Sequence, residues 1–237
     1  MRMHRREFFR LGAGVFAAAL FTNIPEFLFS SQSGDQWAVP KTARVSYLIG
    51  ELKINGIRAG LGAVLNEGDI LQTGDRSEAD IEVRDYAIFH LKANSTVEID
   101  DIFQNAGVTV KRGWFLTIVR SGNDFSVTTP MVLAGVRGTV LFVNVLDDSR
   151  MYLCDCNGKV DIEDLSVAAD SETNETRMVK SIVSNYHTAF TLSKQEGGVK
   201  VARAGLLYHH DSDILKMAKR FQKETEVCRR RKGGEYS

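Results

Sequence analysis

The sequence predicts a mainly β protein, a β-sandwich or β-roll of short antiparallel strands followed by a C-terminal amphipathic helix. Three observations support this fold class. Turn signals recur about every ten residues between positions 45 and 165. Between them, apolar and polar residues alternate with the period of two that is typical of a half-buried strand. Near the end of the chain, an apolar stripe repeats at helical spacing instead.

The first half of the chain reads as a series of hairpins. Leu52 to Ile54 runs into Asn55-Gly56, which is the strongest two-residue signal for a type I′ turn. Alternating segments at 79–83 and 87–91 flank a turn at Asp85-Tyr86. Further short strands are expected at 97–99, 108–110 and 114–119.

Residues 125–145 lie at the centre of the predicted domain. A strand ending at Thr129 is stopped by Pro130, which has no N–H to donate to a sheet. Gly135 and Gly138 then enclose a predicted turn, where we expect positive φ or close backbone approach. The next run is apolar and β-branched, which favours a strand.

The last third of the chain is expected to close with two strands and a helix. Residues 166–180 are polar and acidic and read as a loop, followed by strands at 183–192 and 199–202. The helix is predicted from Asp213 to about Val227, with Asp211 or Ser212 as its N-cap. Its apolar stripe consists of Ile214, Met217, Ala218 and Phe221.

The central segment resembles a known family. Thr128-Thr129-Pro130, then AGVRGT at 134–139 and an apolar strand, is similar to the most characteristic segment of the FecR domain, a β-rich extracytoplasmic module. Similar residues occur in order at Gly50, Ile54 to Gly56, Gly68 to Ile70, Thr73-Gly74, Ser77 to Ala79, Ser95, Val97, Gly113 and Gly158 to Val160.

The resemblance covers about residues 45–165 and implies a β domain outside the cytoplasm. FecR-type regulators carry a cytoplasmic anti-sigma segment before a membrane span, whereas ten residues precede the first apolar run of this sequence. We therefore expect that the regulator function does not transfer. A remnant of a cell-surface signalling regulator is an alternative.

The N-terminal segment reads as an address. Arg5-Arg6, Phe8 and Arg10 precede an apolar run from Leu11 to Phe21, which is short for a membrane span. The pattern resembles a twin-arginine (Tat) signal. That resemblance implies export of a folded protein by the Tat machinery to the periplasm, with the segment either cut near 30–33 or kept as an inner-membrane anchor.

The expected organisation is thus a signal or anchor at 1–33, a linker at 34–44 and a FecR-like β domain at 45–165. A β extension at 166–210 and a helix with a basic tail at 211–237 follow.

The formal net charge is zero but unevenly distributed. Residues 1–10 carry +3 and residues 216–232 carry +6, which leaves −9 for the remainder. An acidic body argues against a nucleic-acid partner. We expect membrane contact only through the N-terminal segment.

A cluster of cysteines and histidines is the main candidate for chemistry. Cys154 and Cys156 are two residues apart in an expected strand, so both point to one face and form half of a soft-metal site. His187, His209 and His210 follow and are the remaining candidate ligands, so the cofactor would be a transition metal. Two alternatives are a Cys-x-Cys disulfide and two small buried side chains.

No catalytic motif supports an enzyme. The sequence holds no nucleophile elbow, Walker loop, dinucleotide fingerprint or HExxH, although Cys154 or Cys156 with His187 could form a nucleophile–base pair. Arg137 is a candidate for binding a carboxylate ligand, or it ties down its own turn through an acidic neighbour. We predict a non-catalytic module of the bacterial cell envelope that binds a small ligand or another protein, with a metal-binding periplasmic protein as the alternative.

Overall fold

The computed structural model describes residues 42–102, 106–165 and 177–221, all within the compact unit Val39–Ser237. The expected signal, nearly all of the linker, the acidic loop at 166–176, the basic tail and Cys228 lie outside the described residues. In the described part, no helix combines the length and the apolar character needed to cross a membrane.

The described chain forms strands and a single helix, and their order along the chain is β1 (Ala43–Ile49), β2 (Leu52–Ile54), β3 (Ile57–Ala59), β4 (Val64–Leu65), β5 (Ile70–Thr73), β6 (Glu78–Val83), β7 (Ala87–Leu91), β8 (Thr96–Asp101), β9 (Gly107–Val119), β10 (Asp124–Thr128), β11 (Val132–Asp147), β12 (Arg150–Asp164), β13 (Arg177–Ser184), β14 (Thr188–Gln195), β15 (Gly198–Ala204) and α1 (Asp211–Arg220). The predicted fold class, mainly β with a C-terminal amphipathic helix, is confirmed.

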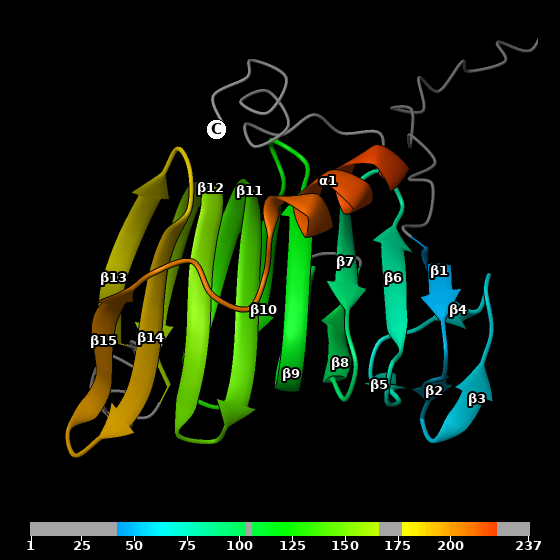
Figure 1. Ribbon diagram of the computed structural model, residues 1–237, viewed down its shortest axis with the longest axis horizontal. Coiled ribbons are helices and arrows are strands. Elements are labelled where there is room, and N and C mark those ends of the chain that lie inside the picture. The colour runs from blue at the N-terminus through cyan, green and yellow to red at the C-terminus, as the bar shows by residue number, and fades with distance from the viewer. Residues whose placement is uncertain (1–41, 103–105, 166–176, 222–237) are drawn as a thin grey trace, which may run out of the picture. The chain divides into compact units, whose positions relative to one another are not determined.

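All of these strands belong to one hydrogen-bonded sheet, whose main order is β15-β14-β12-β11-β10-β9-β7-β6-β1-β4. A branch of β8, β5, β2 and β3 leaves the sheet at β9, and β13 pairs with β12. Figure 1 shows α1 crossing one face of this sheet near β9, β7 and β6. Pairing is antiparallel except between β9 and β10. The sheet is therefore open, and β9 is the strand where it divides.

Strand β9 divides the sheet because its two halves have different partners. The first half pairs with β8, and the second half pairs with β7 and β11. Gly113 lies between the halves with φ +88°, and a Cβ there would approach the Ser95 hydroxyl to 2.6 Å and the Asn94 carbonyl to 2.9 Å. Only glycine fits this crossing.

The turn predicted between Gly135 and Gly138 is wrong, because both residues lie inside the continuous strand β11. Pairing with β12 runs from Val132 to Arg137 and resumes at Val140, so the interruption is a bulge. Gly138 has the expected positive φ, at +58°, but Gly135 does not. The glycines reflect close approach to neighbouring strands, which a single-sequence pattern cannot distinguish from a turn.

Other local predictions are confirmed. Asn55 and Gly56 have φ of +53° and +78°, as a type I′ turn between β2 and β3 requires. The helix begins earlier than predicted, at Asp211, because His210 is its N-cap instead of Asp211 or Ser212. The backbone N–H of His210 donates to the Asp213 carboxylate at 2.9 Å, which satisfies this helix end.

Two apolar cores lie on opposite faces of the sheet. The larger one joins side chains from most strands, whereas the smaller one lies under α1. The helix buries Ile214, Met217, Ala218 and Phe221 against this second face, as the stripe predicted. Each fully buried large side chain contributes about 1.5–3 kcal/mol. The central halves of β9, β11 and β12 are therefore covered on both faces.

Candidate metal centre

Strand β12 places two thiols on the second face of the sheet. Cys154 and Cys156 belong to the smaller core with Tyr152, as alternation along a strand predicts, and neither cysteine has any exposed surface. Their sulfurs are 3.8 Å apart. This is too far for a disulfide bond of about 2.05 Å, and both cysteines are free thiols.

His187 reaches the thiols because a strand is interrupted. The single strand predicted over 183–192 is instead β13 and β14, which pair with successive halves of β12 and are separated at Asn185–His187. At the break the backbone N–H of His187 donates to the Cys156 carbonyl at 3.2 Å. His187 has φ +40°, a left-handed conformation that costs about 1–2 kcal/mol. Such strain occurs most often at functional sites.

His209 enters from the connection between β15 and α1, which crosses the same face of the sheet (Figure 1). Its ring stacks on Phe142 with 4.2 Å between centroids, and the residue is 1% exposed. The preceding Tyr208 has φ +66°, a second left-handed non-glycine residue beside the site. The smaller core therefore receives an imidazole in an otherwise apolar setting.

Four donor atoms converge from these three segments. Those of Cys154, Cys156, His187 and His209 all lie within 4.8 Å of one another. The Cys154 sulfur is 3.5 Å from Nδ1 of His187, and the Cys156 sulfur is 3.3 Å from Nε2 of His209. In a tetrahedral zinc site, typical bond lengths imply about 3.8 Å between sulfurs and about 3.5 Å between sulfur and nitrogen. The observed separations match these edges.

The second ring nitrogen of each histidine is already engaged. Nε2 of His187 donates to the Asp211 carboxylate at 2.8 Å, and Nδ1 of His209 donates to the Leu207 carbonyl at 3.0 Å. The Tyr186 hydroxyl also donates to Asp211, at 3.1 Å. These partners hold both imidazoles in the tautomer whose remaining lone pair points at the thiols, which is the usual arrangement around metal-binding histidines.

The buried thiols favour a positive charge between them. The hydrogen bond from Cys156 holds the pKa of Cys154 down to about 4 against the opposing effect of burial, with further lowering by His187. Burial and the neighbouring Cys154 raise the pKa of Cys156 well above its usual value. One thiol therefore ionises readily and the other does not. A divalent cation would stabilise both thiolates at once.

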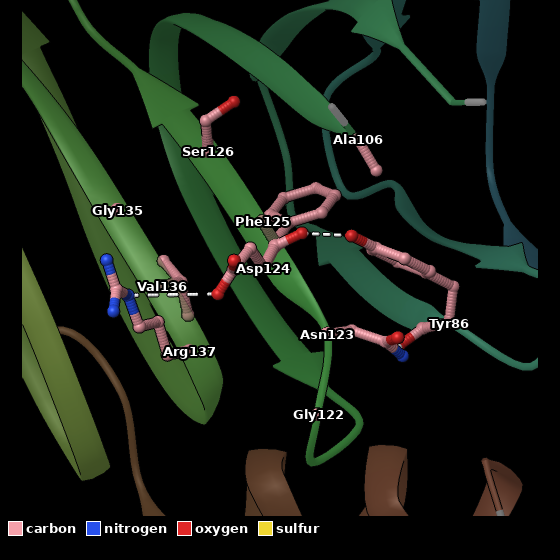
Figure 2. A pocket seen from close by; sticks show the side chains of 10 residues that line it. All are labelled: Tyr86, Ala106, Gly122, Asn123, Asp124, Phe125, Ser126, Gly135, Val136 and Arg137. Atoms are coloured by element: carbon pink, nitrogen blue, oxygen red, sulfur yellow. Dashed lines mark hydrogen bonds and ion pairs between the residues drawn. The ribbon is translucent and has the colours of Figure 1, made fainter. Parts of the chain in front are cut away.

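Two sequence candidates lie elsewhere. His210 is exposed at the start of α1 and is not among the four convergent residues. Arg137 lines a separate hollow of about 500 Å³ beside β10 and β11. Figure 2 shows its guanidinium directed at Asp124, at 3.7 Å, and the two side chains are 63% and 85% exposed. Binding of a carboxylate ligand by Arg137 stays a prediction.

Sequence reasoning missed the two aspartates of the site. Asp211 was assigned only as a helix cap, although its position directly after two histidines was a signal for a carboxylate–histidine pair. Asp155 lies between the cysteines, and burial raises its pKa to about 7. Its carboxylate accepts a hydrogen bond from Thr139 at 3.4 Å. Nothing in the local sequence indicated that Asp155 would be buried.

Comparison with solved structures returns two crystal structures of a proposed anti-sigma factor from Parabacteroides distasonis ATCC 8503. The 1.65 Å structure has 16% identity and a TM-score of 0.46, with 65% of this chain and 76% of that chain covered. The 2.50 Å structure has 16% identity and a TM-score of 0.45, with 56% and 59% covered, so this chain spans less than two thirds of that protein. No curated protein matches.

The family model described as FecR protein matches residues 69–161. This range lies inside the 45–165 expected from the sequence and contains both bulge glycines, Gly138 and Gly158, and the two cysteines. The resemblance noted in the sequence is thereby confirmed. Through the domain that covers residues 69–161, the chain belongs to the FecR family.

Proposed function

We propose that this chain is a non-catalytic module of the bacterial cell envelope that binds a zinc ion through Cys154, Cys156, His187 and His209. The observation that carries the proposal is the convergence of the four donor atoms within 4.8 Å of one another. FecR family membership supports a role connected with cell-surface signalling and a location in the envelope.

The donor set favours zinc over other biological metals. Two thiolates and two imidazoles in a tetrahedral arrangement suit Zn²⁺, whereas Mg²⁺ and Ca²⁺ prefer oxygen ligands. The sulfur–sulfur distance of 3.8 Å equals the edge expected for two zinc-bound thiolates. Cu⁺ also accepts thiolates, and metal analysis distinguishes it from zinc.

The same geometry favours a structural role over a catalytic one. Catalytic zinc sites keep one position open for water or substrate, whereas structural sites are closed by four protein ligands. Here the two sulfurs are inaccessible, and the His187 side chain is 5% exposed. A nucleophilic cysteine would need access to its substrate. The Cys–His pairs therefore support metal binding better than a cysteine-dependent enzyme.

Metal analysis of the full chain purified without a histidine tag tests the proposal. We expect about one zinc per chain by mass spectrometry, and tetrahedral absorption bands after replacement with cobalt(II). Cys154→Ser with Cys156→Ser, and separately His209→Ala, should lose the metal. His210→Ala is the matched control, because this adjacent histidine is exposed at the helix N-cap. Absence of metal from every preparation, or equal loss in both histidine variants, would contradict the proposal.

We also propose Tat-dependent export, on the basis of Arg5-Arg6 and the apolar run that follows. Export of a folded chain suits a metal centre assembled from three distant segments. Replacing Arg5 and Arg6 with lysines should leave the protein in the cytoplasm, as cell fractionation would show. Unchanged export would contradict the Tat assignment without affecting the metal centre. The envelope protein or ligand that the module contacts stays a prediction.

A further inference from the structure

The segment after β15 forms a cap over the second face of the sheet, and we define this cap as residues 205–221. Its first residues contact β12, where the Tyr152 hydroxyl donates to the Gly205 carbonyl at 3.0 Å and accepts from the Leu207 N–H at 3.1 Å. The indole N–H of Trp114 donates to the Tyr208 carbonyl at 2.7 Å. The cap thus lies directly on the aromatic side chains of this face.

Two metal-site groups belong to the cap itself. His209 supplies a donor atom, and Asp211 holds the ring of His187. The other donors come from β12 and from the break between β13 and β14. A metal ion at this point would therefore join the N-terminal half of the cap to two strands of the sheet.

The far end of the cap has an anchor of a different kind. Arg220 hydrogen-bonds through Nε to Asp80, which has no exposed surface and also bonds to Nδ1 of His90. Nearer the middle, Lys92 pairs with Asp213 at 2.8 Å. The nine residues from Asp211 to Arg220 span about 14 Å along the helix. The anchor at Arg220 is thus separate from the metal ligands.

We propose that the bound metal fastens the N-terminal half of the cap, and that loss of the metal releases this half and exposes Trp114 and Phe142 beneath it. The inference rests on the proposed metal binding and adds control of the second face of the sheet. Without a cation, two buried thiols and two buried imidazoles hold the cap by weak sulfur–nitrogen contacts alone. Burying such groups without a compensating partner is unfavourable, and opening relieves it.

The proposal has a thermodynamic consequence that a merely adjacent metal would lack. If metal binding stabilises the closed cap, then any change that opens the cap must weaken metal binding by the same factor. A substitution at the distant Arg220 anchor should therefore reduce zinc affinity, although it contacts no ligand.

The first experiment follows the cap in the full chain with a Trp37→Phe background, which leaves Trp114 as the single tryptophan. Removal of zinc with a strong chelator should shift Trp114 emission to longer wavelength, because the indole becomes exposed to water. Amide hydrogen exchange should rise in peptides covering 205–214 and 185–188, but not in the central part of β11. Adding zinc back should reverse both changes.

The second experiment measures zinc affinity by competition with a chromogenic chelator. Arg220→Gln should raise the dissociation constant about fivefold or more, in the range typical of coupled sites. Lys219→Gln is the matched control, because Lys219 is the exposed neighbour in the same helical turn. If Arg220→Gln does not fold, Lys92→Gln removes the milder Lys92–Asp213 anchor and should raise the constant about two- to fivefold.

The outcomes separate the two proposals. A chain that binds no metal overturns the proposed function and this inference together. A chain that binds zinc, but whose Trp114 emission and cap exchange stay the same after chelation, overturns only the inference. Equal zinc affinity of the anchor variant and Lys219→Gln would likewise overturn the inference and leave metal binding in place.

Discussion

Nε2 of His187 donates a hydrogen bond to the carboxylate of Asp211 at 2.8 Å, which leaves Nδ1 of the same ring 3.5 Å from the Cys154 sulfur. The two residues come from different parts of the fold, His187 from the break between β13 and β14 and Asp211 from the first turn of α1. Burial disfavours charge on His187, but hydrogen bonds to Cys154 and Asp211 outweigh it and raise its pKa. Asp211 therefore connects the helix to the metal centre.

Asp211→Asn should weaken zinc binding about 10- to 100-fold without removing a ligand. The amide cannot supply the negative charge that orients and polarises the His187 ring. Zinc affinity by chelator competition measures the effect. Ser212→Ala, at an exposed position in the same helical turn, should leave the affinity unchanged. An Asp211→Asn protein with the affinity of the unsubstituted chain would show that Asp211 only caps the helix.

Zinc should protect Cys154 and Cys156 from alkylation. The pKa of Cys154 is lowered to about 4, so this sulfur is a thiolate at neutral pH once the metal is gone, and thiolates are the reactive form. Labelling with iodoacetamide and mass spectrometry in a Cys228→Ser background isolates these two cysteines. Equal labelling rates with zinc and with chelator would argue against a metal bound at the thiols.

Gly158→Ala should destabilise the protein by about 2–4 kcal/mol. Gly158 has φ +115°, and a Cβ there would lie 2.4 Å from both Cβ and Oγ1 of Thr139 in β11. The matched control is Gly197→Ala, where φ is +85° but nothing lies within 4 Å, so only the backbone cost of about 1–2 kcal/mol remains. Urea unfolding compares the two, and similar losses would show that the bulge tolerates a methyl group.

Tyr86→Phe should change how stability depends on pH. Burial, and then the charge of Asp124, raise the pKa of Tyr86, whose hydroxyl donates to the Asp124 carbonyl. Because the folded pKa is raised, the stabilisation by Tyr86 is fully present below the unfolded pKa of about 10 and is lost as the pH rises through the folded value.

At neutral pH the Tyr86→Phe variant should be about 1 kcal/mol less stable, and the difference should shrink above pH 10. Urea unfolding at pH 7, 9 and 11 measures it, with Tyr208→Phe as the control for an exposed hydroxyl. A difference that stays constant with pH would contradict the assigned burial effect.

Much of the fold could be predicted because the determinants are local. Alternation along a strand placed Cys154 and Cys156 on one face, and the dipeptide Asn55-Gly56 specified its own turn. The apolar stripe of the helix followed from spacing alone. The match to FecR also depended on the order of local turn and strand residues.

The errors occurred where a neighbouring strand decides the outcome. Gly135 and Gly138 looked like the ends of a turn, but β10 and β12 pair with both and extend the strand through them. The expected strand over 183–192 breaks at Asn185–His187 opposite the bulge in β12. A glycine that avoids a neighbour and a glycine that forms a turn are identical in sequence.

Sequence alone determined the residue types of the site: two thiols on one strand face and a few late histidines. The tertiary structure brought His209 and not His210 to the thiols, because the connection crosses the sheet face with one histidine inward and the other at the helix cap. It also joined Asp211 to His187, 24 positions earlier in the chain. Such contacts depend on how distant segments pack together, and neither spacing nor periodicity contains that information.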